Sequence, residues 1–218
     1  MSDDLNIILT EARNVLKSFT DTLQKDVRHC IFYEKSTPDW PAPFPALIYC
    51  FSMIDLVASL YSRNKSEEES RIEENAIYNI DKLEIDDEMK KKAKEGIRYQ
   101  VSANARRYMV EIMSYPKLQS ELLLKIFRNP LVHQAQPKSI ITHDNNKYTW
   151  KYFHKNRTEH LKIVPLTDGI SLFNICIWSL AEDIVDSVFK PNGYLNKLEN
   201  EDNLQKNFNK KIKEYGWI

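Results

Sequence analysis

Residues 44–61, FPALIYCFSMIDLVASLY, form the most apolar stretch of the chain. The stretch is about long enough to cross a membrane, since a spanning helix needs roughly 20 apolar residues. Asp55 lies near its middle, however, and a carboxylate at the centre of a bilayer is costly. We therefore interpret Ala46–Tyr61 as a buried core helix and expect no membrane association.

The composition around this core helix indicates one mostly α-helical domain. The chain has 218 residues, of which 42% are hydrophobic and 28% charged, and it contains only 4 glycines. This hydrophobic content supports a packed core, and the glycine scarcity argues against a many-stranded sandwich with glycine-rich turns. The formal net charge is zero, which excludes a protein that coats nucleic acid by bulk positive charge but not one with a local basic groove.

The cysteines and the N-terminus predict a cytoplasmic location. Cys30, Cys50 and Cys176 are odd in number and far apart, so a disulfide scaffold is not expected. The first residues are acidic, whereas the start of an export signal is basic.

Helical periodicity continues on both sides of the core helix. Apolar residues recur at steps of three and four, and this spacing predicts further helices over Asp3–Arg28, Glu88–Met113, Lys117–Phe127, Gly169–Phe189 and Asn203–Tyr215. The proline-rich segment Ser36–Pro45 is predicted to be a loop, and the charged segment Arg63–Lys94 a solvated pair of helices. Residues 191–218 are predicted to be a C-terminal helical extension.

Residues 147–164 follow a different period. Aromatic and apolar residues alternate with their neighbours on both sides of a polar break at 155–159, which predicts a β-hairpin insert over residues 146–165. The strand that carries Tyr148, Trp150 and Tyr152 also carries lysines, a mixture that suits stacking on a single-stranded nucleic acid. The same mixture suits a hairpin that packs its aromatic face on the helices.

One short segment carries a chemical motif. Residues 123–133, LLKIFRNPLVH, place an arginine and a histidine five positions apart, and Asn129 precedes a proline, so the helix is predicted to end or kink there. The pattern Arg128-Asn129-Pro130-Leu131-Val132-His133 resembles the RNxxxH signature of the HEPN superfamily, and the order of predicted helices is similar to that family as well. The resemblance implies an antiparallel HEPN-like helical bundle over residues 1–218, with the hairpin as an insert.

The resemblance also implies an activity. HEPN ribonucleases cleave RNA without a metal or cofactor, so Arg128, Asn129 and His133 are the expected catalytic residues of an endoribonuclease of defence or toxin type. An imidazole can transfer protons near neutral pH, and a guanidinium binds phosphate oxygens. One histidine does not readily serve as both base and acid, and family members are thought to form composite sites as dimers. The implied partners are RNA, a second copy of the chain, and an antitoxin or regulatory protein.

Two alternatives to this activity remain open. The first is a catalytically inactive HEPN-like protein that binds a partner protein or nucleic acid, and the second is an unrelated helical bundle. Toxins paired with a minimal nucleotidyltransferase often carry a modified tyrosine two positions after the histidine, where this chain has Ala135. Modification at that site is therefore not expected.

Further residues are candidates for supporting roles. A buried Asp55 requires a partner, either a neighbouring helix end or loop, or else Arg128 or His133 of the motif. Candidate contacts to nucleic acid are Lys125, Lys138, Arg106 and Arg107. Three histidines have a spacing that fits no common metal cage, so we interpret them as surface residues of the hairpin and predict no metal site: His143, His154 and His160.

Overall fold

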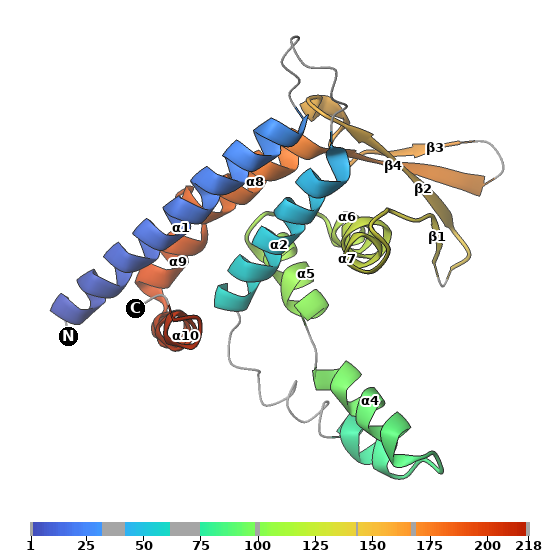
Figure 1. Cartoon of the computed structure of the whole chain (residues 1–218), viewed down its shortest axis with the longest axis horizontal. Helices are drawn as coiled ribbons and strands as arrows, with labels where there is room; N and C mark the ends of the chain where they lie inside the picture. Colours follow the sequence, from blue (N-terminus) through green and yellow to red (C-terminus); the bar gives the residue numbers. More distant parts are fainter. Residues whose placement is uncertain are drawn as a thin grey trace.

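The computed structural model describes residues 2–31, 42–61, 75–98, 101–142, 144–166 and 169–216 (Figure 1). It is mostly α-helical with one small four-stranded sheet, which confirms the predicted fold class at that level. Along the chain the long helices are α1 (Ser2–Ile31), α2 (Pro43–Tyr61), α4 (Asp87–Arg98), α5 (Val101–Glu111), α8 (Ile177–Phe189) and α10 (Asp202–Glu214).

Helix α2 is the centre of the bundle. It packs against α1, α5, α8 and α10, and Figure 1 shows it between α1 and α8 on one side and α5 on the other. In the part of the chain that the structure describes, α2 alone is long and apolar enough to cross a membrane, but more than half of it is buried inside the protein. Its hydrophobicity therefore serves the core.

The predicted boundaries shift at several places. Helix α2 begins at Pro43, so the last residues of the predicted loop Ser36–Pro45 are helical, because a proline in the first turn has no N–H to satisfy. Residues 32–41 of that loop lie outside the described residues. The predicted single helix Glu88–Met113 corresponds to α4 and α5, which ends at Glu111, and residues 99–100 between them also lie outside.

The charged segment is helical where it is described. Residues 75–81 form a helix beside α4, and the Lys90 Nζ donates to the Asp81 carbonyl oxygen at 3.2 Å. Residues 82–86 separate the two helices, as predicted for the break near Asp86. Residues 62–74 lie outside the described part.

The C-terminal extension is integrated into the bundle. It consists of α9 (Tyr194–Asn200) and α10, and the buried residues of α10 are Leu204, Phe208 and Ile212. The Asn207 Nδ2 donates to the Leu60 carbonyl oxygen at the end of α2, at 2.7 Å. Residues 202–214 therefore stabilise the core helix by both burial and hydrogen bonding.

The predicted β-hairpin over residues 147–164 is wrong. Strands β2 (Lys147–Phe153) and β3 (Ile163–Pro165) do not pair with each other, because β4 (Ile170–Cys176) lies between them. β4 is parallel to β2 and antiparallel to β3, and β1 (Ile140–Ile141) completes the order β1-β2-β4-β3.

The missing strand is the first part of the predicted helix Gly169–Phe189. Phe173, Asn174, Ile175 and Cys176 are all buried, as expected for a central strand covered on both faces. Because neighbouring residues of this strand are buried alike, they show no alternation of apolar and polar residues, and periodicity cannot distinguish the strand from a buried helix. Within the predicted helix Gly169–Phe189, the helical part is α8, which begins at Ile177.

The aromatic face of β2 packs on the helices. The Trp150 ring lies 6.1 Å from the Phe44 ring and 6.0 Å from the Phe127 ring, both edge to face. Tyr152 makes a similar contact with Phe44 at 6.2 Å, and Tyr148 is buried. Of the two interpretations of these aromatic residues, the structure therefore supports packing on the bundle.

The motif lies inside a continuous helical segment. α6 (Lys117–Leu122) is followed by a π-helical turn, η1 (Leu123–Arg128), and then by α7 (Asn129–Gln134). Of the two predicted outcomes, an end or a kink at Asn129, the helix end is therefore wrong, and the motif instead contains a change from π-helical to α-helical hydrogen bonding. The Asn129 N–H reaches back five residues to the Leu124 carbonyl oxygen, which is the π-helical pattern.

Hydrogen bonding explains how the helix tolerates Pro130. In an α-helix the N–H of residue 130 would serve the Ile126 carbonyl oxygen, and proline has no N–H. Here the Lys138 N–H donates to that oxygen at 3.0 Å, so it is not left unpaired. The helix ends instead at Ala135, whose φ of 57° is left-handed.

Candidate functional site

Arg128 is held from two sides. Its Nε and Nη2 donate to the Asp55 Oδ2 at 3.2 and 2.8 Å, and its Nη1 donates to the Asn129 Oδ1 at 2.9 Å. Asp55 comes from the core helix α2, and Arg128 ends the π-helical turn. Of the partners considered for Asp55, the structure selects Arg128.

The ion pair between Asp55 and Arg128 is largely buried, and the burial affects the Asp55 carboxyl. The side chains of Arg128 and Asp55 keep only 15% and 24% of their exposure. Burial raises the pKa of the Asp55 carboxyl, and the hydrogen bond and charge of Arg128 oppose that rise. The other oxygen, Asp55 Oδ1, is buried without a hydrogen-bond partner among the described residues. The carboxylate is thus retained at an energetic cost, and it orients the guanidinium.

His133 is separate from this pair. It lies exposed on α7, and among the described residues its ring makes no hydrogen bond with Arg128, whose polar partners are Asp55 and Asn129. Positions five apart on an α-helix differ by about 140° around the axis and by roughly 7.5 Å along it. Arg128 turns toward α2, whereas His133 lies on an accessible part of the helix.

The predicted basic residues divide into two groups. Arg106 on α5 forms an ion pair with Glu121 of α6 at 3.3 Å, and Arg107 is partly buried on the same helix. Lys125 and Lys138 are exposed, and together with Asn129 they line a hollow of about 320 Å³ next to β1. The structure therefore brings Asn129 and the two lysines together beside Arg128.

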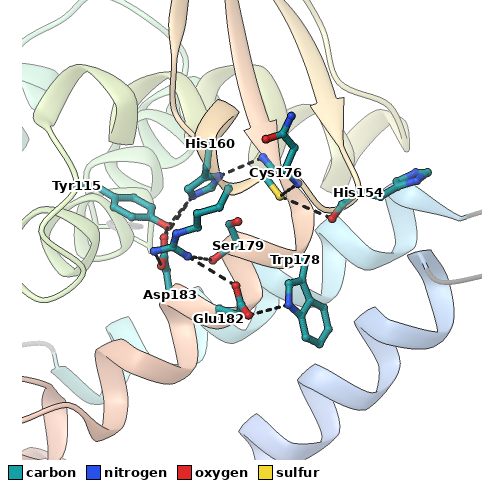
Figure 2. Close-up of polar contacts among 10 residues, drawn as sticks. Tyr115, His154, His160, Cys176, Trp178, Ser179, Glu182 and Asp183 are labelled. Atoms are coloured by element: carbon teal, nitrogen blue, oxygen red, sulfur yellow. Dashed lines mark hydrogen bonds and ion pairs between the residues drawn. The ribbon is translucent and has the colours of Figure 1, made fainter.

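A second polar cluster lies where the sheet meets the helices (Figure 2). The Tyr115 hydroxyl donates to the Asp183 Oδ2 at 2.6 Å and lies 3.0 Å from the His160 Nε2. Arg157 forms an ion pair with the Asp183 Oδ1 at 2.5 Å. These residues come from the segment before α6, from the chain between β2 and β3, and from α8. The cluster therefore ties three separate parts of the chain together.

The hydrogen bonds of His160 define its tautomer. The Cys176 backbone N–H donates to Nδ1 at 3.1 Å, so Nδ1 carries no proton and the ring proton is on Nε2, facing Tyr115 and Asp183. The His160 side chain is only 5% exposed, so its interpretation as a surface histidine is wrong. His154 is partly buried, and His143 lies outside the described residues.

Burial and hydrogen bonding shift two acidic groups of this cluster in opposite directions. Burial, reinforced by the Asp183 carboxylate, raises the pKa of Tyr115 well above its usual value. Burial alone would raise the pKa of Asp183, but hydrogen bonds from His160, Tyr115 and Arg157 outweigh it and lower that pKa. Asp183 is therefore a stable carboxylate with donors on both oxygens.

Within the described ranges, no group of three or more histidine, cysteine or acidic side chains is placed to hold a metal ion. Cys30, Cys50 and Cys176 are free thiols.

Comparisons with protein-family models, with curated proteins and with solved structures find no match to this chain. The HEPN resemblance therefore rests on the RNxxxH motif and on the order of the helices.

No local sequence signal predicts the second cluster. Tyr115, His160 and Asp183 are 45 and 23 residues apart in sequence, so no short motif contains them. Their only local signal is Tyr115 directly before a proline, which marks a turn rather than a hydrogen-bond donor. The contact depends on β4, the strand that was predicted to be helix.

Proposed function

We propose that this chain is a metal-independent endoribonuclease of the HEPN type, folded as a HEPN-like bundle, that acts as a homodimer in a defence or toxin role. The observation that carries the proposal is the arrangement of Arg128. Two carboxylate contacts and one amide contact hold its guanidinium, and these use three of its five N–H donors. Two donors remain for the oxygens of a phosphate.

The proposed chemistry needs a proton acceptor and a proton donor. The attacking group is the 2′-hydroxyl of the RNA, which loses its proton, and the leaving 5′-oxygen gains one. The products are a 2′,3′-cyclic phosphate and a free 5′-hydroxyl, with the proton count balanced. An exposed imidazole such as that of His133 suits either transfer.

The separation of His133 from Arg128 supports a composite site. Within one chain these two side chains lie on different faces of the helix, and His133 is exposed. A second copy related by a two-fold axis would add a second His133 and Arg128, so that one histidine acts as base and the other as acid. Light scattering tests this directly, and a strict monomer at the assay concentration contradicts it.

An RNA-cleavage assay tests the chemistry. His133→Ala and Arg128→Ala should each lower the cleavage rate by roughly 10²–10⁴-fold. Gln134→Ala is the matched control, because Gln134 is exposed on the same helical turn and has no assigned role. Cleavage should persist in a chelator and fail on RNA with a 2′-deoxy sugar at the cut position. Activity that requires a divalent metal, or that persists in His133→Ala, refutes the mechanism.

One observation favours an inactive binding module as the second candidate. The charge of Arg128 is already neutralised by Asp55 within the chain, which weakens its attraction to a phosphate. In that case the wild-type protein binds RNA or a protein partner but cuts no RNA.

A further inference from the structure

A hollow of about 320 Å³ lies on the accessible side of the motif. Lys125 and Asn129 line it from the π-helical turn and the start of α7, and Lys138 lines it from the segment that follows α7. Ile140, Ile141 and Thr142 complete the wall, and Figure 1 shows β1 beside α6 and α7. We call this feature the lysine hollow.

The Asn-Pro step of the motif builds the hollow. Because Pro130 has no N–H to donate to the Ile126 carbonyl oxygen, the Lys138 N–H donates to it instead. This hydrogen bond holds the segment after α7 against the helix. The π-helical turn has more than four residues per turn, so Lys125 and Asn129, four apart, lie on the same face. Turns of this kind occur frequently at functional sites.

The hollow carries uncompensated positive charge. Lys125 and Lys138 are exposed, and neither ammonium has an ion-pair or hydrogen-bond partner among the described residues. This contrasts with Arg106, which is neutralised by Glu121. Two carboxylates are near the lysines in sequence, and both have other partners. Glu121, four residues before Lys125, forms the ion pair with Arg106, and Asp144, six residues after Lys138, accepts a hydrogen bond from the Thr142 hydroxyl within its own turn.

The remaining groups of the hollow match a nucleotide. The Asn129 Oδ1 accepts from Arg128, so its Nδ2 remains available as a donor, and Asn129 is one of the residues that line the hollow. Ile140 is partly buried, whereas Ile141 is 65% exposed and offers an apolar surface. Two cations and an amide donor suit a phosphate, and an exposed aliphatic side chain suits the face of a base or a sugar.

We propose that the lysine hollow is a nucleotide subsite, which binds a phosphate and the adjoining base of an RNA strand next to the phosphate at Arg128. Asn129 connects the two positions, since it contacts Arg128 and lines the hollow. The inference rests on the proposed function, because it describes how the same substrate is held.

Fluorescence anisotropy tests the subsite separately from cleavage. The probe is a labelled single-stranded RNA of about 12 nucleotides, within the range that single-strand sites cover, and every protein carries His133→Ala so that the probe stays intact. The test variant adds Lys125→Ala and Lys138→Ala. The control variant adds Lys206→Ala and Lys213→Ala, two exposed lysines of α10 that also have no partner among the described residues.

Salt dependence gives the expected size of the effect. Each phosphate contact on a single strand contributes about 0.7 to the slope of log affinity against log salt, so two lysines contribute about 1.4. At 0.1 M salt the test variant should therefore bind the RNA about 25-fold more weakly than the His133→Ala protein does. This difference in affinity should disappear as the salt concentration approaches about 1 M. Ile141→Ser should weaken binding without changing the slope.

Each outcome separates the two proposals. If the test and control variants bind alike, or if the His133→Ala protein binds no RNA, the subsite is wrong. If the lysines matter but Ile141→Ser has no effect, the hollow holds a phosphate alone and its nucleotide assignment is wrong. If the predicted loss occurs while the wild-type protein cuts no RNA, the subsite stands and the endoribonuclease proposal fails.

Discussion

Replacing Asp55 is the sharpest test of the Arg128 environment. Removing one partner of a fully buried ion pair costs about 3–5 kcal/mol, whereas an exposed pair is worth roughly 0.2–1 kcal/mol. With side-chain exposures of 24% and 15%, the Asp55–Arg128 pair lies between these limits. We therefore expect Asp55→Ala to lower the free energy of unfolding by about 2 kcal/mol. For a chain of this size the melting temperature should fall by about 4–8 °C.

Two further substitutions at this position separate charge from hydrogen bonding. Asp55→Asn keeps an oxygen that can accept from Arg128, so we expect a loss of about 1 kcal/mol. Asp55→Leu fills the space but leaves the Nε and Nη2 donors of Arg128 without their acceptor, so it should be more harmful than Asp55→Asn. Ser52→Ala is the matched control, since Ser52 is exposed on the same helix, and it should change stability by less than about 0.5 kcal/mol.

A double-mutant cycle isolates the pair itself. Urea denaturation of Asp55→Ala, Arg128→Ala and the double variant should give a coupling energy of about 1–2 kcal/mol. A coupling below about 0.3 kcal/mol, which is the error expected for independent sites, refutes the reasoning. So does an Asp55→Leu variant that is more stable than the wild type and keeps full activity, because Asp55 would then have no orienting role.

Three further predictions concern the second cluster and the π-helical turn. Tyr115→Phe removes a hydrogen bond to a carboxylate, so calorimetry should show a free energy of unfolding lower by about 2 kcal/mol. RNA cleavage per folded molecule should stay unchanged, and lost cleavage would contradict a purely structural role. Because the pKa of Asp183 is lowered in the folded state, its stabilisation is complete above the unfolded value of about 3.9 and is lost as the pH falls through the folded value. Melting temperatures should therefore show Asp183→Asn well below wild type at pH 7 and close to it in acid, and a constant difference across pH would argue against this assignment. Pro130→Ala supplies an N–H that competes with the Lys138 N–H for the Ile126 carbonyl oxygen. Hydrogen exchange at the Lys138 amide should therefore become about fivefold faster, which corresponds to the loss of one hydrogen bond of about 1 kcal/mol. Unchanged exchange would mean that the proline does not free this oxygen.

Local sequence patterns were sufficient to predict helices whose apolar residues must be buried, and to predict that a buried carboxylate has a partner. The apolar run of α2 and the periodic residues of α1 and α10 predict helices that the structure contains, with boundaries shifted by a few residues. A carboxylate inside an apolar helix must be paired, so Asp55 was recognisable as a residue with a partner. Its position in sequence did not say which of several groups that partner was, and the packing of α2 on η1 and α7 decided the question.

The sheet could not be predicted in the same way. β4 is buried on both faces, so its residues have no reason to alternate, and nothing local distinguishes them from the buried helix that follows. Strands β2 and β3 resemble a hairpin because each alternates by itself, yet pairing is a property of two strands that meet in space. The order β1-β2-β4-β3, with β4 between β2 and β3, is therefore set by the tertiary structure.

The sequence by itself determined that this chain is mostly helical, that residues 46–61 form a core helix, and that Arg128, Asn129 and His133 share one short segment, because helix periodicity and motif spacing are local. The tertiary structure alone decided that Asp55 holds Arg128, that the Lys138 N–H replaces the one missing from Pro130, and that Tyr115, His160 and Asp183 meet at the sheet edge. The physical reason is the same in each case: a buried polar group requires a partner, and that partner can come from any part of the chain that packing brings within hydrogen-bonding distance.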